Sequence, residues 1–282
     1  MAALCFMLFG CNSQQETCQI VATTLPVYEF SKILCEGTDL EVFQLITQDI
    51  ACLHNYTLQV PQMQAIERAE LLIISGAGLE DFLKDISTNS LKLIDASENI
   101  PLNCMDQHHS HEGDHNHDVD PHYWLSPENA KIMVKNICNS LTEIYPEYAD
   151  VIANNAKKLE IELTKLSDYG SDKLSNLSCH KLITFHDGFG YMAEAFQLEI
   201  VHAIEEESGS EASASELIDL IQIVDEYTLP AVFTERNGSA SSASILKTEC
   251  NIPIYDLDMA MSGESYFSAM YHNIDILSEA LK

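Results

Sequence analysis

The sequence predicts an α/β fold with two lobes, each a mainly parallel sheet flanked by helices, joined by one long rigid helix. Short apolar runs alternate with helical patterns in both halves of the chain, and this alternation is typical of parallel sheets covered by helices. A long segment between the halves has a helical apolar stripe and no strand signal. The 282 residues suffice for one large domain or two of ordinary size, with a real core in either case.

Short apolar runs predict strands in the first half of the chain. One helix is expected to have Pro26 just inside its start, because proline is well tolerated in the first turn. Another should begin after Ser126, an N-cap residue that Pro127 follows. The predicted strands are Gln19–Thr23, Glu41–Ile46, Leu71–Ser75 and Leu91–Asp95.

The second half shows the same alternation. Ser213 and Glu216 have the spacing of a capping box, and the apolar residues Leu217 and Leu220 follow at helical spacing, so a helix is expected there. The predicted strands are Lys181–Phe185, Glu199–Ala203, Ala231–Thr234 and Pro253–Leu257.

The middle segment is predicted to be a linking helix over residues 146–176, between lobes at 18–145 and 177–282. Its apolar residues recur at spacings of four, seven, four and three, which gives one stripe. A helix of about 28 residues would be about 42 Å long, enough to act as a strut. Two helices broken near Gly170 are the alternative. The stripe consists of Tyr148, Ile152, Leu159, Leu163 and Leu166.

The N-terminus has the pattern of a secretion signal. Ala2–Phe9 is an apolar run too short to cross a bilayer, and the stretch LFGC ending at Cys11 resembles a bacterial lipobox. We therefore expect residues 1–17 to be a lipoprotein signal and tether, with Cys11 lipidated. The first basic residue is Lys32, and a start codon assigned too late would explain that. A buried N-terminal strand is the competing interpretation.

The net charge and the cysteine content exclude several classes of protein. The 44 acidic and 14 basic residues give a net charge of −30, which disfavours a nucleic-acid binder and docking on anionic lipid but permits a cation as ligand. Of nine cysteines, seven lie beyond the signal, and no CxxC is present, so a disulfide framework is not expected. A disulfide bond between Cys179 and Cys250 is left as an alternative.

Residues 103–122 form a His-rich loop that also holds five acids and no Lys or Arg. Its composition cannot bury a core. The imidazoles are too closely spaced for a single rigid tetrahedral site, so we expect a flexible array suited to transient capture of zinc, copper or nickel. A pH-sensitive polar loop is the alternative. The array consists of His108, His109, His111, His115 and His117.

Three histidines and one aspartate outside the His-rich loop are candidate metal ligands. His186 and Asp258 come directly after strands of the second half, at the edge where open α/β sheets bind ligands. His54 and His122 lie in loops of the first half. If all four side chains converged, they would make a closed tetrahedral site suited to Zn²⁺. Periodicity alone does not select these four residues.

Several motifs resemble those of one family. DPHYWLSP at Asp120–Pro127 is close to the family stretch DPHxWLDP, and HDGFGY at His186–Tyr191 is close to HDAFGYF. Gly209–Leu217 is similar to an EPSxxxL helix start, Phe233–Glu235 matches the next strand end, and Leu257-Asp258 matches a position that supplies a carboxylate in some members. Over nearly the whole chain the sequence resembles the substrate-binding lipoproteins of bacterial ABC importers for zinc and manganese.

The resemblance implies a metal site in the interlobe cleft, with His54, His122, His186 and Asp258 as ligands. Water or a residue of Glu205–Glu207 could replace Asp258. His186 and the His-rich loop favour the zinc branch over the manganese branch. The resemblance further implies a monomer outside the cytoplasm, at the cell surface or in the periplasm, that reaches the membrane through its lipid anchor only and delivers Zn²⁺ to an importer permease.

A zinc-dependent hydrolase is the alternative function from a different class of protein. HExxH, a nucleophile elbow and a phosphate loop are all absent from the sequence, and a fourth protein ligand would close the position that a catalytic zinc needs. We therefore expect no enzyme activity. Some surface lipoproteins of the family have adhesion roles, but no sequence feature here supports one.

Overall fold

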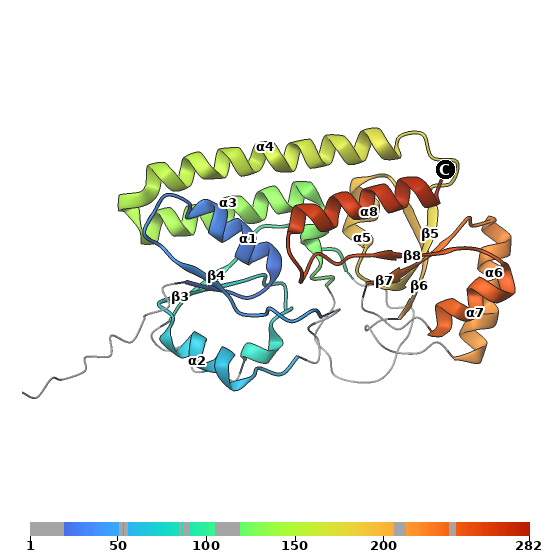
Figure 1. Ribbon diagram of the computed structural model, residues 1–282, viewed down its shortest axis with the longest axis horizontal. Helices are drawn as coiled ribbons and strands as arrows, with labels where there is room; N and C mark the ends of the chain where they lie inside the picture. The colour runs from blue at the N-terminus through green and yellow to red at the C-terminus, as the bar shows by residue number, and fades with distance from the viewer. Residues whose placement is uncertain are drawn as a thin grey trace, which may run out of the picture.

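The computed structural model describes residues 20–50, 53, 56–84, 86, 91–104, 119–205, 213–236 and 241–282. These residues form two four-stranded parallel sheets, with strand orders β2-β1-β3-β4 and β6-β5-β7-β8 (Figure 1). The predicted α/β fold of two helix-flanked lobes with a long joining helix is confirmed. The first sheet precedes the long helix α4 in the chain and the second follows it.

The first sheet contains the predicted strands of the first half. Its central strands β1 and β3 are almost wholly buried, which explains their continuous apolar runs. Helices α1 (Leu25–Leu34) and α3 (Pro127–Ile144) lie on one side of the sheet and α2 (Val60–Arg68) on the other (Figure 1). The strands are β1 (Ile20–Ala22), β2 (Val42–Gln44), β3 (Leu71–Ile74) and β4 (Lys92–Asp95).

The second sheet aligns the carboxyl ends of its strands. His186 pairs in register with Glu205, and Glu235 pairs with Leu257. The flanking helices are α5 (Gly190–Ala195), α6 (Ala214–Tyr227), α7 (Ser241–Cys250) and α8 (Tyr266–Ala280), and α6 begins at the predicted capping box. The strands are β5 (Lys181–His186), β6 (Glu199–Glu205), β7 (Val232–Glu235) and β8 (Ile254–Leu257).

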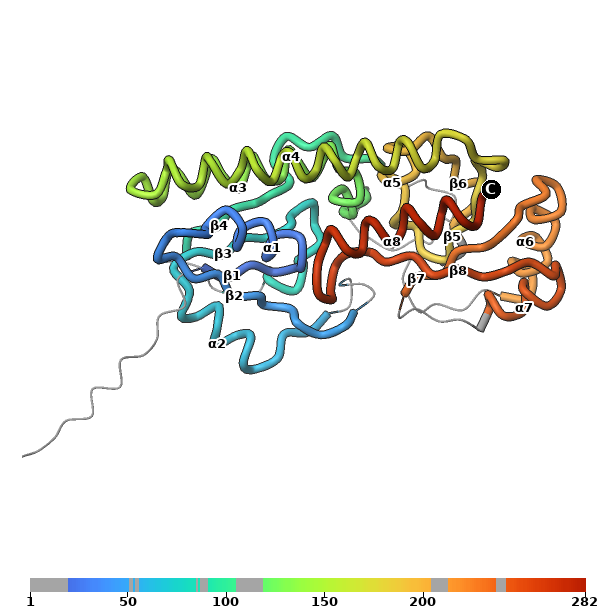
Figure 2. Tube along the Cα trace, turned by 45° about the horizontal axis from the view of Figure 1, so that its top comes forward, coloured from blue at the N-terminus to red at the C-terminus, as the bar shows by residue number. Residues whose placement is uncertain are grey.

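The long helix α4 (Ala149–Leu174) runs along both lobes (Figures 1 and 2) and packs against α1, α3 and α8. It begins three residues later than predicted, because Pro146–Tyr148 forms a separate 3-10 turn. The alternative of a break near Gly170 is wrong. A Cβ atom at Gly170 would lie 2.1 Å from Cε1 of Phe196, so this glycine permits close helix packing.

Hydrogen bonds join the lobes next to the predicted site. The Trp124 indole N–H donates to the Met259 carbonyl at 2.9 Å, and the Tyr266 hydroxyl donates to the Trp124 carbonyl at 2.8 Å. The Leu25 N–H donates to the Met261 carbonyl at 3.1 Å. The loop between β8 and α8 is therefore fixed to segments of the first lobe.

Two further expectations concern cysteines and membranes. Cys179 and Cys250 are free thiols, so the open possibility of a bridge is not realised. Within the described ranges, no helix is long and apolar enough to cross a bilayer.

Candidate metal-binding site

His122 is fully buried and held by the carboxylate two residues before it. The Asp120 Oδ1 atom accepts the His122 backbone N–H at 2.9 Å and lies 2.7 Å from the His122 Nδ1 atom. Carboxylate partners of this kind fix the tautomer and ring orientation of metal-ligating histidines. Coordination by His122 would therefore use Nε2.

The backbone of Asp120 is fixed by the second lobe. The Tyr191 hydroxyl, at the start of α5, donates to the Asp120 carbonyl at 2.9 Å and accepts the Asn103 N–H at 2.8 Å. Burial raises the pKa of Tyr191 to about 12, although the Asn103 N–H lowers it. The phenol therefore remains protonated at neutral pH and keeps its donor role.

His186 ends β5 and is 1% exposed. Its ring meets the edge of the His122 ring, with 5.1 Å between the ring centroids and an interplanar angle of 84°. Gly188 permits this arrangement, because a Cβ atom there would lie 2.7 Å from both His186 Cδ2 and Met259 Cε. The structure thus brings together one predicted histidine from each half of the chain.

Acidic residues end the strands beside His186. The backbone of Glu205 pairs in register with His186 on one side, and β7 ends at Glu235 on the other. Glu235 is only 6% exposed. Sequence reasoning matched Glu235 to a strand end without giving it a role. Its place at the end of the strand next to β5 is the signal that could have found it.

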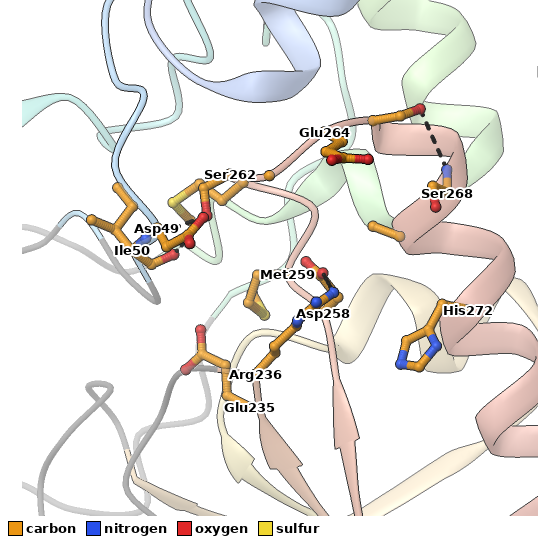
Figure 3. A pocket seen from close by; sticks show the side chains of 14 residues that line it. Asp49, Ile50, Glu235, Arg236, Asp258, Met259, Ser262, Glu264, Ser268 and His272 are labelled. Carbon is orange, nitrogen blue, oxygen red and sulfur yellow. Dashed lines mark hydrogen bonds and ion pairs between the residues drawn. The ribbon is translucent and has the colours of Figure 1, made fainter.

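Asp258 lies in a neighbouring pocket of about 400 Å³ (Figure 3). Its Oδ2 atom accepts a hydrogen bond from Arg236 Nη1 at 3.0 Å, and its Oδ1 atom accepts the Ala260 N–H at 2.8 Å. The Asn273 side chain binds both the N–H and the carbonyl of Asp258. The carboxylate is therefore held by a cation and a backbone donor, and sequence reasoning missed Arg236.

The described residues include only part of the predicted ligand set. Among the described side chains, no three of His, Cys, Asp and Glu lie close enough together to hold a metal ion. The pair His122–His186 is present, whereas Asp258 does not form such a group with it. Outside the described residues lie Cys11, His54, His108, His109, His111, His115, His117, Glu206, Glu207 and the side chain of Glu205.

Described residues flank the segments that carry His54 and the His-rich array. Leu53, next to His54, is 1% exposed and belongs to the main core. Cys104 and Val119 form an antiparallel bridge, so the two ends of the His-rich segment lie side by side. Val119 is three residues before His122 in the chain, so the bridged ends of the segment are close in sequence to the first histidine of the pair.

Glu80 is a buried acid of the first lobe that is connected by hydrogen bonds to the turn after His122. Glu80 accepts hydrogen bonds from the Thr23 hydroxyl and from the N–H groups of Ser75 and Gly76, at 2.6–3.0 Å. Burial raises the pKa of Glu80 to about 7, although these hydrogen bonds lower it. The Tyr123 hydroxyl donates to the Ser75 carbonyl at 2.6 Å, which connects this acid to the turn after His122.

Comparisons with known proteins agree with the fold and the motifs. Zinc-binding protein AdcA of Streptococcus pyogenes serotype M1 is 27% identical over 286 residues, covering 92% of this chain and 55% of the relative. Zinc-binding lipoprotein AdcA of Streptococcus pneumoniae (strain ATCC BAA-255 / R6) is 28% identical over 301 residues, covering 99% of this chain and 60% of the relative. The chain thus spans a little over half the length of these curated relatives.

Solved structures match over a larger share of their own chains. A crystal structure of ZnuA has a TM-score of 0.82 at 26% identity, covering 94% of this chain and 99% of that one. The Zn(II)-bound ZnuA-like domain of Streptococcus pneumoniae AdcA has a TM-score of 0.77 at 26% identity, with the same coverage. The family described as ZnuA, zinc-uptake complex component A, periplasmic, matches residues 20–280. The resemblance seen in the motifs is thereby confirmed, and the chain belongs to the ZnuA family of zinc-uptake components.

Proposed function

We propose that this chain is an extracytoplasmic solute-binding protein that captures Zn²⁺ between its lobes and delivers it to the permease of an ABC importer. The observation that carries the proposal is the buried pair of His122 and His186, one from each half of the chain, with Asp120 orienting the first. The zinc-binding relatives and the Zn(II)-bound structural neighbour support it.

The proposed ligands are His54, His122, His186 and Asp258. Water or an acid of Glu205–Glu207 is the alternative fourth ligand. Three imidazole nitrogens favour zinc over Mn²⁺, which prefers oxygen ligands. Manganese binding by the same site is the second candidate function, and Asp258 is the residue that favours it.

The role is transport rather than catalysis. A catalytic zinc keeps an open coordination position for water or substrate, and a fourth protein ligand would fill that position. A zinc-dependent hydrolase is therefore the weaker alternative. The absorption spectrum of the Co²⁺-substituted protein separates the two, because four protein ligands give a tetrahedral spectrum that exogenous anions leave unchanged, whereas an open site responds to them.

The lobes are expected to move little during uptake. The helix α4 packs against both lobes, and hydrogen bonds from Trp124 and Leu25 tie the β8–α8 loop to the first lobe. The ion would enter the site, the lobes would close slightly over it, and the loaded protein would dock on the permease. We propose a monomer held at the outer side of the membrane through lipidated Cys11.

The His-rich segment is proposed to raise the local zinc concentration near the site. The pairing of Cys104 with Val119 supports this role, because it brings the ends of the segment together three residues before His122. Deletion of Gln107–His117 should leave equilibrium binding intact and impair uptake at low zinc. Unimpaired zinc uptake by the deletion variant would show that the segment has no capture role.

Competitive titration of the metal-free protein tests the main proposal. His186→Ala should weaken Zn²⁺ binding by orders of magnitude, because it removes one of the few nitrogen ligands. His180→Ala is the matched control, since His180 is exposed just before β5 and should have no effect. Equal effects of the two substitutions would refute the assigned site, and tighter binding of Mn²⁺ than Zn²⁺ by the unsubstituted protein would refute the choice of metal.

A further inference from the structure

Arg236 and Asp258 form an ion pair at the edge of the proposed metal site. Arg236 directly follows Glu235, the last residue of β7, and Asp258 directly follows β8, so neighbouring strands fix both residues. The Arg236 side chain is 59% exposed, whereas that of Asp258 is 14% exposed. The guanidinium thus reaches from the surface onto a carboxylate that is mostly shielded from water (Figure 3).

Both carboxylate oxygens of Asp258 are engaged. Oδ2 accepts from Arg236 and Oδ1 accepts the Ala260 N–H. Each oxygen keeps a second lone pair for a cation, but the Oδ2 atom shares its negative charge with the Arg236 guanidinium and is therefore a weaker donor to a metal ion.

The charges around this pair make Arg236 electrostatically important. The described lining of the pocket contains four acids and His272, and Arg236 is the only Lys or Arg among these lining residues. Removal of the guanidinium would therefore change both the hydrogen bonding of Asp258 and the local potential. The acids are Asp49, Glu235, Asp258 and Glu264.

We propose that Arg236 is a specificity-determining residue, which competes with the bound ion for the Asp258 carboxylate and so disfavours Mn²⁺ relative to Zn²⁺. The inference rests on the proposed metal-binding function. Hard Mn²⁺ depends on oxygen ligands, whereas imidazole ligands suit Zn²⁺. An arginine that holds the site's carboxylate therefore penalises Mn²⁺ more than Zn²⁺.

The test is the ratio of Zn²⁺ and Mn²⁺ dissociation constants in Arg236→Gln. A partly exposed ion pair is worth about 1 kcal/mol, so the variant should bind Mn²⁺ roughly fivefold more tightly and Zn²⁺ less than about twofold more tightly. Arg236→Lys keeps the charge and should remain close to the unsubstituted protein. Arg68→Gln, which makes the same charge change on the exposed last turn of α2, is the control and should leave the ratio unchanged.

A double-substitution cycle separates competition for Asp258 from a general change in potential. Asp258→Asn should remove the gain, so that Arg236→Gln has no further effect on the ratio in that background. An unchanged ratio in Arg236→Gln, or a gain that survives in the double variant, would overturn the inference. His186→Ala reports on the proposed function independently, because loss of Zn²⁺ binding there supports the site whatever Arg236 does.

Discussion

Substitution of Asp120 should weaken zinc binding although Asp120 is not a proposed ligand. Its Oδ1 atom lies 2.7 Å from His122 Nδ1 and accepts the His122 backbone N–H at 2.9 Å. Removal of such outer partners typically costs about 10–100-fold in metal affinity, which corresponds to about 1.4–2.7 kcal/mol. Asp120→Ala removes the acceptor and should approach the upper figure. Asp120→Asn keeps a neutral acceptor, so its loss of zinc affinity should be near the lower figure of about tenfold.

The assay is competitive Zn²⁺ titration together with urea unfolding of the metal-free protein. Asp95→Asn provides a matched control, because the Asp95 Oδ1 atom accepts the N–H and hydroxyl of Ser97, also two residues along the chain. All three substitutions should lower the free energy of unfolding by about 1 kcal/mol. Only those at Asp120 should weaken zinc binding. Unchanged zinc affinity in Asp120→Ala would show that the carboxylate does not orient His122.

Two further predictions concern the histidine pair and the first lobe. Gly188→Ala should weaken Zn²⁺ binding roughly tenfold in the same titration, because the new Cβ atom would lie 2.7 Å from the His186 ring and displace it; unaltered affinity would show that the ring can yield freely. The stability of the metal-free protein should fall as pH rises from 4.5 to about 7, because the unfolded chain releases the Glu80 proton near 4.5 and the folded chain retains it to about 7. The loss should reach at most about 3 kcal/mol, and Glu80→Gln should flatten this part of the urea-midpoint profile; a variant with the same pH slope as the unsubstituted protein would contradict the assignment.

The fold could be predicted from sequence because its signals are local. The central strands β1, β3 and β5 are short, mostly apolar runs buried in parallel sheets. Ser126 and Ser213 accept the N–H groups of Asn129 and Glu216 as N-caps should. Gly170 was the ambiguous position. Its helical context is local information, but the Phe196 ring that requires a glycine there comes from a different segment.

The site was predictable only in part. His122 and His186 stand in recognisable motifs, and the structure brings them together. The roles of Glu80 and Arg236 depend on contacts between residues far apart in sequence or on neighbouring strands, such as Thr23 with Glu80 and Arg236 with Asp258. No periodicity or spacing encodes such contacts. The ion pair between Arg236 and Asp258 could therefore not be predicted from the sequence, because it depends on the pairing of β7 with β8.

The hydrogen bonds at the β8–α8 loop have a consequence for how the molecule unfolds. Tyr266 is completely buried, yet its hydroxyl binds Trp124 and its ring lies 4.9 Å from that of Phe30, both in the first half of the chain. Melting of either lobe would therefore strip apolar cover from the other and leave buried donors without acceptors. We therefore expect these contacts to couple the two lobes, so that heat or denaturant disrupts both in a single transition.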